Sequence, residues 1–114
     1  MRIISGTHRG KQLNVPKDLV VRPTTDYAKS GLFNILAHRF QLKKLAVVDL
    51  FAGTGSLSYE FISRGCTNVI AIDKDPACIR FIKQSFEQLD PSRNARAIQS
   101  DALKWLRNHP GKFD

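Results

Sequence analysis

One stretch of this 114-residue sequence constrains the fold more than any other. Residues 45–51, Leu-Ala-Val-Val-Asp-Leu-Phe, are apolar except for one aspartate, and the turn Ala-Gly-Thr-Gly follows them directly. A continuous apolar run is typical of a strand buried on both faces of a parallel sheet. We therefore expect residues 45–50 to form such a strand, followed by a tight turn into a helix.

The rest of the chain repeats this order of strand, turn and helix. Further strands are predicted over 68–73 and 95–99, and helices over about 56–64, 76–90 and 101–109. Gly65 is expected to close the first of these helices, and Asp75 with Pro76 to open the second. Alternating strands and helices form a parallel sheet with right-handed crossovers. The predicted fold class is therefore α/β, a Rossmann-like doubly wound sheet.

A region of different pattern precedes the sheet. Within residues 2–15, apolar and polar side chains alternate on both sides of a turn bounded by Gly6 and Gly10. This pattern predicts a β-hairpin. The segment Arg22-Pro-Thr-Thr-Asp26 predicts an extended connector that ends in a helix cap. A helix is expected over about 26–37, with its large apolar side chains facing the core: Leu32, Phe33, Ile35 and Leu36.

Positive charge is concentrated in this N-terminal region. The chain has 18 lysines and arginines against 10 acidic residues, for a net charge of +8. Residues 1–45 hold nine of the basic residues and two acidic ones, so this region carries +7. The asymmetry indicates either a surface that binds a polyanion or a merely solvated, solubilising face.

The turn after the first strand carries the clearest chemical signal. Gly53 and Gly55 allow the backbone to approach a ligand at the N-terminus of the next helix, as in nucleotide sites. The dinucleotide fingerprint needs a third glycine, where this chain has Ser58. Asp49, at the end of the strand, would repel a pyrophosphate but attract an ammonium group. These features favour S-adenosylmethionine over a dinucleotide.

Two further carboxylates follow the next strands. Asp73 ends the second strand, 20 residues after Gly53, where an acid can accept both hydroxyls of a ribose. The alternative role for Asp73 is to cap the turn before Pro76. Asp101 follows the third strand, where it could accept the exocyclic amine of adenine, cap the next helix, or do both.

Several of these segments together resemble one family. The run Asp49-Leu-Phe-Ala-Gly-Thr-Gly55 resembles motif I of class I methyltransferases. With Met1-Arg-Ile-Ile-Ser-Gly6, Arg22-Pro-Thr-Thr-Asp26 and Leu32-Phe-Asn-Ile-Leu36, the whole chain from Met1 to Asp114 resembles the RsmD family. Those bacterial enzymes methylate a guanine N2 in the 16S ribosomal RNA. The resemblance implies a cytoplasmic, S-adenosylmethionine-dependent enzyme whose partner is ribosomal RNA or a small-subunit assembly particle.

The resemblance also implies roles for regions and residues. Residues 1–25 would form a basic hairpin and connector that face RNA, and residues 26–114 the cofactor-binding part. The expected cofactor-binding residues are Asp49, Phe51, Gly53, Thr54, Gly55, Asp73, Lys74, Asp101 and Ala102. The expected RNA-binding residues are Arg2, Arg9, Lys11, Arg22 and Thr24. Contacts between such cations and phosphates would add salt-dependent affinity without reading the RNA sequence.

The chain departs from the family pattern at its C-terminal end. Family members carry Asp-Pro-Pro-Tyr or Asp-Pro-Pro-Phe after a fourth strand, where the motif holds the target amino group. Residues 1–114 contain neither version, so we expect the catalytic motif to lie beyond Asp114. We also expect the chain to be the N-terminal part of a longer enzyme and inactive alone. The strand over 45–50 would then have a bare edge, which favours self-association.

Two alternative functions stay open: a dinucleotide-dependent oxidoreductase, and a non-catalytic RNA-binding module with a vestigial cofactor fold. The three histidines are scattered and predict no metal site. Cys66 and Cys78 lack CxxC spacing and are expected to be reduced, buried side chains. No apolar stretch is long enough to predict a membrane span or a signal peptide, which agrees with a cytoplasmic protein.

Overall fold

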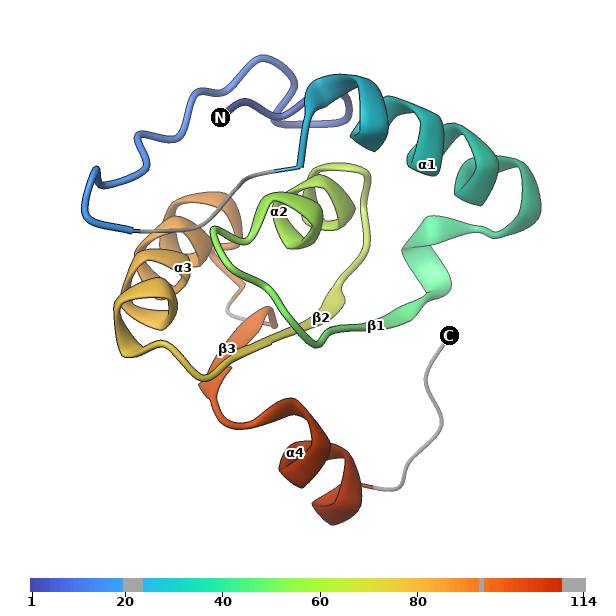
Figure 1. Cartoon of the computed structure of the whole chain (residues 1–114). Helices are drawn as coiled ribbons and strands as arrows, with labels where there is room; N and C mark the ends of the chain where they lie inside the picture. The colour runs from blue at the N-terminus through green and yellow to red at the C-terminus, as the bar shows by residue number, and fades with distance from the viewer. Residues whose placement is uncertain (20–23, 93, 110–114) are drawn as a thin grey trace.

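The structure, a computed structural model, describes residues 1–19, 24–92 and 94–109. Its elements are α1 (Asp26–Arg39), the 3-10 helix η1 (Leu42–Lys44), β1 (Ala46–Asp49), α2 (Ser56–Ser63), β2 (Asn68–Asp73), α3 (Pro76–Leu89), β3 (Arg96–Gln99) and α4 (Ala102–Asn108). The three strands form a parallel sheet in the order β1-β2-β3 (Figure 1). The predicted α/β alternation is confirmed, and both ends of β2 lie where the sequence placed them.

Helices cover both faces of the sheet, as a doubly wound fold requires. Side chains alternate along β2, so Val69 and Ala71 join one core with α2 and α3. Ile70 and Ile72 point the other way and pack with Trp105 of α4. Figure 1 shows α4 separated by the sheet from α2 and α3.

The ends of α2 and α3 follow from local sequence. Gly65 lies just after α2 with a φ of 101°, and its N–H donates to Ile62 while the N–H of Cys66 donates to Phe61. This pair of bonds is the Schellman arrangement, which favours glycine. α3 begins at Pro76, and the Asp75 carboxylate accepts from the N–H of Ala77 at 2.9 Å. Both predicted boundaries are confirmed.

The prediction for β1 is wrong in one respect. Within the described sheet β1 is an edge strand that pairs only with β2, which agrees with the expected bare edge. Val47 is its one buried residue, and Val48 lies partly buried. The strand is therefore not fully buried on both faces, because Val48 packs only at the margin of the cluster formed by Ile70, Ile72 and Trp105 of α4.

The prediction for α1 is also partly wrong. Phe33 is fully buried, with its ring centroid 4.7 Å from that of Phe61. Leu32 and Ile35, however, are 39% and 58% exposed. The buried residues of the helix are Lys29 and Phe33, and Leu36 is partly buried, so only Leu32 and Ile35 of the four predicted core residues are exposed.

The first 13 residues form a looser hairpin than predicted. A single antiparallel bridge joins Arg2 to Gln12, and no strand is formed within these residues. Backbone hydrogen bonds still join the two arms, from Ile3 N–H to the Lys11 carbonyl at 3.0 Å and from Leu13 N–H to the Met1 carbonyl at 2.9 Å. The turn between the arms is held on α2, since the N–H groups of Thr7 and His8 donate to Ser63. None of the helices in the described ranges is long and apolar enough to cross a membrane.

Candidate functional site

A cavity of about 310 Å³ opens where β1 and β2 end. In parallel α/β sheets, ligands bind outside the carboxyl ends of the strands. The cavity is lined by Thr24, Asp49, Phe51, Ala52, Gly53, Thr54, Ser56, Leu57 and Asp73. The fold thus brings the glycine turn together with two of the three predicted carboxylates.

The glycine turn is shaped by its own backbone and by α2. Gly53 and Gly55 have φ values of 57° and 86°, in the region that favours glycine. A Cβ atom on Gly55 would lie 2.6 Å from the ring of Tyr59, so a larger residue does not fit there. Because Gly55 is also the N-cap of α2, no side chain caps this helix at the cavity.

Asp73 ties the glycine turn to the end of β2. One carboxylate oxygen accepts from the N–H of Gly53 and the other from the N–H of Asp75, both at 2.9 Å. The alternative role as a turn cap is therefore confirmed. Each oxygen has a second lone pair and can accept a further hydrogen bond. Binding of ribose hydroxyls remains a prediction.

Asp49 lies beneath the turn without a cationic partner among the residues the structure describes. Burial raises the pKa of its carboxyl above the ordinary value, the hydrogen bond from Ser58 opposes the shift, and the nearby Asp73 charge adds to it. The Ser58 hydroxyl donates to Asp49 at 2.9 Å. A fixed carboxylate in this environment can stabilise a ligand ammonium group.

Four predicted cofactor residues are not part of the lining of this cavity: Gly55, Lys74, Asp101 and Ala102. Asp101 caps α4 by accepting from the N–H of Lys104 at 3.0 Å. The N–H of Ser100 donates to the Asp73 carbonyl, so the start of α4 adjoins the end of β2. The cap role of Asp101 is confirmed. Contact of Asp101 and Ala102 with adenine, and the place of Lys74 beside the ribose, remain predictions.

The last residues of the chain, which would precede the predicted catalytic motif, lie outside the described residues. The motif is expected beyond Asp114, and Asp114 itself lies outside the described residues, together with the rest of 110–114. The structure therefore does not test where the catalytic residues lie, and their position beyond Asp114 remains a prediction. The cavity described above is built entirely from residues 24–73.

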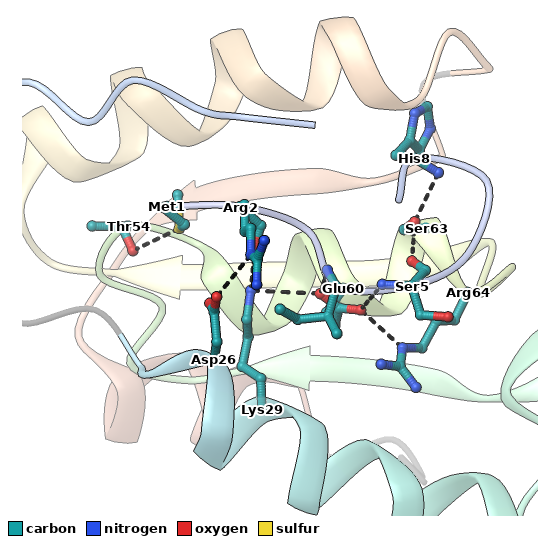
Figure 2. A network of polar contacts seen from close by, with 11 residues as sticks. Met1, Arg2, Ser5, His8, Asp26, Lys29, Thr54, Glu60, Ser63 and Arg64 are labelled. Carbon is teal, nitrogen blue, oxygen red and sulfur yellow. Dashed lines mark hydrogen bonds and ion pairs between the residues drawn. The ribbon is translucent and has the colours of Figure 1, made fainter. Parts of the chain in front are cut away.

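Figure 2 shows a polar network that the sequence analysis missed, with Glu60 of α2 at its centre. The Glu60 carboxylate is fully buried and accepts from the N–H groups of Ile4 and Ser5 at 2.8 and 3.2 Å. It also accepts from Arg64 Nε at 2.9 Å. The Lys29 ammonium lies 3.5 Å from Glu60 and donates to the carbonyl of Arg2 at 2.7 Å.

This network changes the interpretation of the basic N-terminal region. Lys29 is 1% exposed and cannot contact a polyanion. Arg2 is exposed, but its Nε atom bonds to Asp26 at 2.9 Å. Arg9 and Lys11 are exposed as the RNA-binding prediction requires, and Arg22 lies outside the described residues. Thr24, by contrast, lines the cavity. The net charge counted from the sequence of the N-terminal region is therefore larger than the positive charge free on its surface.

The two cysteines are free and buried, as predicted. Burial raises the pKa of Cys78 to about 11, with further contributions from the carboxylates of Asp73 and Asp75. Such a thiol is protonated and unreactive at neutral pH. Within the described ranges, no group of three or more His, Cys, Asp or Glu side chains is placed to hold a metal ion.

Comparison with known proteins identifies the family. A family described as "Conserved hypothetical protein 95" matches residues 1–114. The chain belongs to this family. The comparisons support the resemblance to the RsmD family, because relatives that share this region carry that enzyme's name.

Two relatives illustrate the match. A putative rRNA methyltransferase of Bacillus subtilis is 35% identical over 106 residues, covering 93% of this chain and 56% of the relative. Ribosomal RNA small subunit methyltransferase D of Escherichia coli K12 is 36% identical, with 93% and 52% of the two chains covered. The chain thus spans about half the length of the curated relatives it matches.

Solved structures agree with the family. A putative methyltransferase from Escherichia coli superposes with a TM-score of 0.81 at 37% identity, covering 93% of this chain and 56% of the other. A coclaurine N-methyltransferase, 19% identical, has a TM-score of 0.52 over 85% of this chain and 27% of its own and shares the fold alone. The fold is therefore that of class I methyltransferases, as the sequence predicted.

Proposed function

We propose that this chain is the S-adenosylmethionine-binding part of an enzyme that methylates a guanine N2 in 16S ribosomal RNA. One observation carries the proposal: two carboxylates, Asp49 and Asp73, flank a glycine turn at one cavity at the carboxyl edge of the sheet. The family and the names of its members support it.

We assign to each part of S-adenosylmethionine a protein group whose chemistry suits it. Asp49, which lacks a described cationic partner, suits the methionyl ammonium. The backbone of 53–55, together with Thr54 and Phe51, would cradle the methionyl chain. Asp73 would accept the ribose hydroxyls, with Lys74 beside it, and Asp101 and Ala102 would border the adenine. When bound, the cofactor supplies a methyl group that is already activated, so the protein's task is to bind and position it.

The proposed RNA-facing surface is the basic N-terminal loop. Arg9 and Lys11 are exposed there, and phosphate contacts are made by such cations. Arg22 and Thr24 would extend the surface toward the cavity, which Thr24 lines. The partner would be ribosomal RNA or a small-subunit assembly particle, and the protein would then act in the bacterial cytoplasm.

The proposal is tested by calorimetric titration of the chain with S-adenosylhomocysteine, with NAD as a comparison. We expect S-adenosylhomocysteine to bind and NAD not to bind. Asp73→Ala should weaken binding by about 1.5–3 kcal/mol, the range for a hydrogen bond to a charged group. Asp18→Ala, which removes an exposed carboxylate outside the cavity, is the matched control. An unchanged dissociation constant in Asp73→Ala would defeat the ribose assignment.

The same titrations separate the alternative functions. Binding of NAD in place of S-adenosylhomocysteine would support an oxidoreductase. Tight RNA binding without any cofactor binding would support a non-catalytic RNA-binding module. Because residues 1–114 contain no Asp-Pro-Pro-Tyr or Asp-Pro-Pro-Phe motif, we expect the isolated chain to bind cofactor without transferring the methyl group to RNA.

A further inference from the structure

A second cavity, of about 410 Å³, lies away from the cofactor site, beside the residues that lead into β1. Its wall is formed by the end of α1, by η1 and by Arg64, the C-cap of α2. Phe40, the C-cap of α1, belongs to this wall and is 47% exposed. The volume falls in the range of sites that hold small ligands. The cavity therefore has room for a ligand beside an exposed aromatic side chain.

Positive charge surrounds this cavity, and the segment that forms most of its wall has no acidic residue. Residues 27–48 contain neither aspartate nor glutamate. Lys43 and Lys44 line the cavity, are exposed and form no ion pair with any other described residue. Arg64 shares the Glu60 carboxylate with the buried lysine of α1, so these three side chains together keep a net charge of +1. The surroundings of the cavity therefore favour an anionic ligand.

The end of α2 connects this cavity to the basic N-terminal loop. The Ser63 carbonyl accepts from the N–H of Thr7 in that loop at 2.8 Å. Figure 2 shows the loop, Ser63 and Arg64 together at this end of the helix. Next along the chain, Gly65 lies so close to η1 that a Cβ atom on it would be 3.0 Å from Cγ of Lys43. The loop and the lysines of η1 therefore belong to one continuous surface.

Cations and an exposed aromatic side chain around one cavity are the features of a site for single-stranded nucleic acid. In such sites the cations follow the phosphates, and aromatic rings stack on the bases. A polyanion without rings would leave Phe40 unused, and an apolar partner would leave the two lysines unpaired. We propose that the cavity binds one unpaired nucleotide of RNA, with its base stacked on Phe40 and its flanking phosphates on Lys43 and Lys44. This inference rests on the proposed function and extends its RNA-facing surface from the N-terminal loop to η1.

The test compares two polyanions, of which only one carries bases. One is a single-stranded uridine octamer, and the other is inorganic polyphosphate. Phe40→Ala should weaken binding of the octamer about tenfold, the loss expected for one stacked base, and leave the affinity for polyphosphate unchanged. Lys43→Gln and Lys44→Gln should each weaken both probes and lower the salt dependence by about one phosphate contact. Leu103→Ala and Lys104→Gln, at exposed positions of α4 across the sheet, are the controls and should change neither affinity.

A second variant covers the case in which Phe40→Ala does not fold. Phe40→Leu keeps an apolar side chain and removes the ring, so it should show the same selective loss for the octamer. Equal losses for both probes, or no loss at all, would overturn the stacking role of Phe40. A change of oligomeric state in light scattering, with RNA affinity unchanged, would identify a second copy of the chain as the occupant and overturn the proposal.

Titration of the same preparations with S-adenosylhomocysteine separates this inference from the proposed function. The Phe40 and lysine variants should bind S-adenosylhomocysteine as tightly as the unmodified chain, because none of these residues lines the cofactor cavity. If the unmodified chain binds S-adenosylhomocysteine but not the octamer, this inference fails and the cofactor site stands. If it binds neither, both fail.

Discussion

Replacing Lys29 with methionine tests the buried network that joins the N-terminal segment and α1 to α2. Methionine keeps the length of the apolar stem and removes the ammonium. The lost contacts are the 2.7 Å hydrogen bond to the Arg2 carbonyl and the 3.5 Å ion pair with Glu60. Both charged side chains are essentially inaccessible, with exposures of 1% and 0%, so water cannot replace what is lost.

The size of the effect follows from what still surrounds Glu60. Removing one partner of a buried ion pair typically costs about 3–5 kcal/mol, because the other charge is left uncompensated. Here Arg64 and the N–H groups of Ile4 and Ser5 still bond to the carboxylate. We therefore expect Lys29→Met to lower the free energy of unfolding by about 2–3 kcal/mol, at or just below the lower limit of that range.

Urea denaturation followed by circular dichroism measures this change. The exposed Lys17→Met is the control and should stay within about 0.5 kcal/mol of the unmodified chain. Glu60→Gln and the double variant complete a mutant cycle, in which the two single losses should exceed the double loss by about 0.5–3 kcal/mol. A Lys29→Met variant as stable as the Lys17→Met control, or strictly additive losses, would refute the reasoning.

Three further outcomes are expected. Because burial raises the pKa of Asp49, the folded state holds that proton more tightly than the unfolded state, and stability falls as rising pH ionises the carboxyl. Asp49→Asn should therefore raise the melting temperature at pH 7 but not at a pH below 3.8, the ordinary value of this pKa; a lower melting temperature at pH 7 would contradict this. Arg9→Ala and Lys11→Ala should each weaken binding to a 16S RNA fragment and reduce its salt dependence by about one phosphate contact, whereas Arg2→Ala, whose cation is already paired, should change it less. Equal effects of the three variants in filter binding at several salt concentrations would count against that surface. Finally, the open edge of β1 should make the isolated chain self-associate, and a monomer by light scattering at high concentration would argue against it.

Local sequence determined the order and ends of the elements. The Asp75-Pro76 start of α3 and the Gly65 end of α2 each depend on hydrogen bonds between residues a few positions apart. The apolar run of β2 is equally local, since a strand in the middle of a parallel sheet is apolar throughout. The glycine turn and its carboxylates could likewise be predicted, because topology places the ends of parallel strands side by side.

Only the tertiary structure decided which of these residues are buried and what they contact. Lys29 looked like one more surface cation, and Leu32 like a core residue, yet the first is buried and the second partly exposed. Glu60 has partners 56, 55 and 31 positions away, as well as Arg64, the C-cap of its own helix. The sequence did not predict that the Ser56 hydroxyl is buried without a described partner, because that depends on the segments that pack around it. Burial depends on which distant segments pack together, and helical or strand periodicity describes only the element itself.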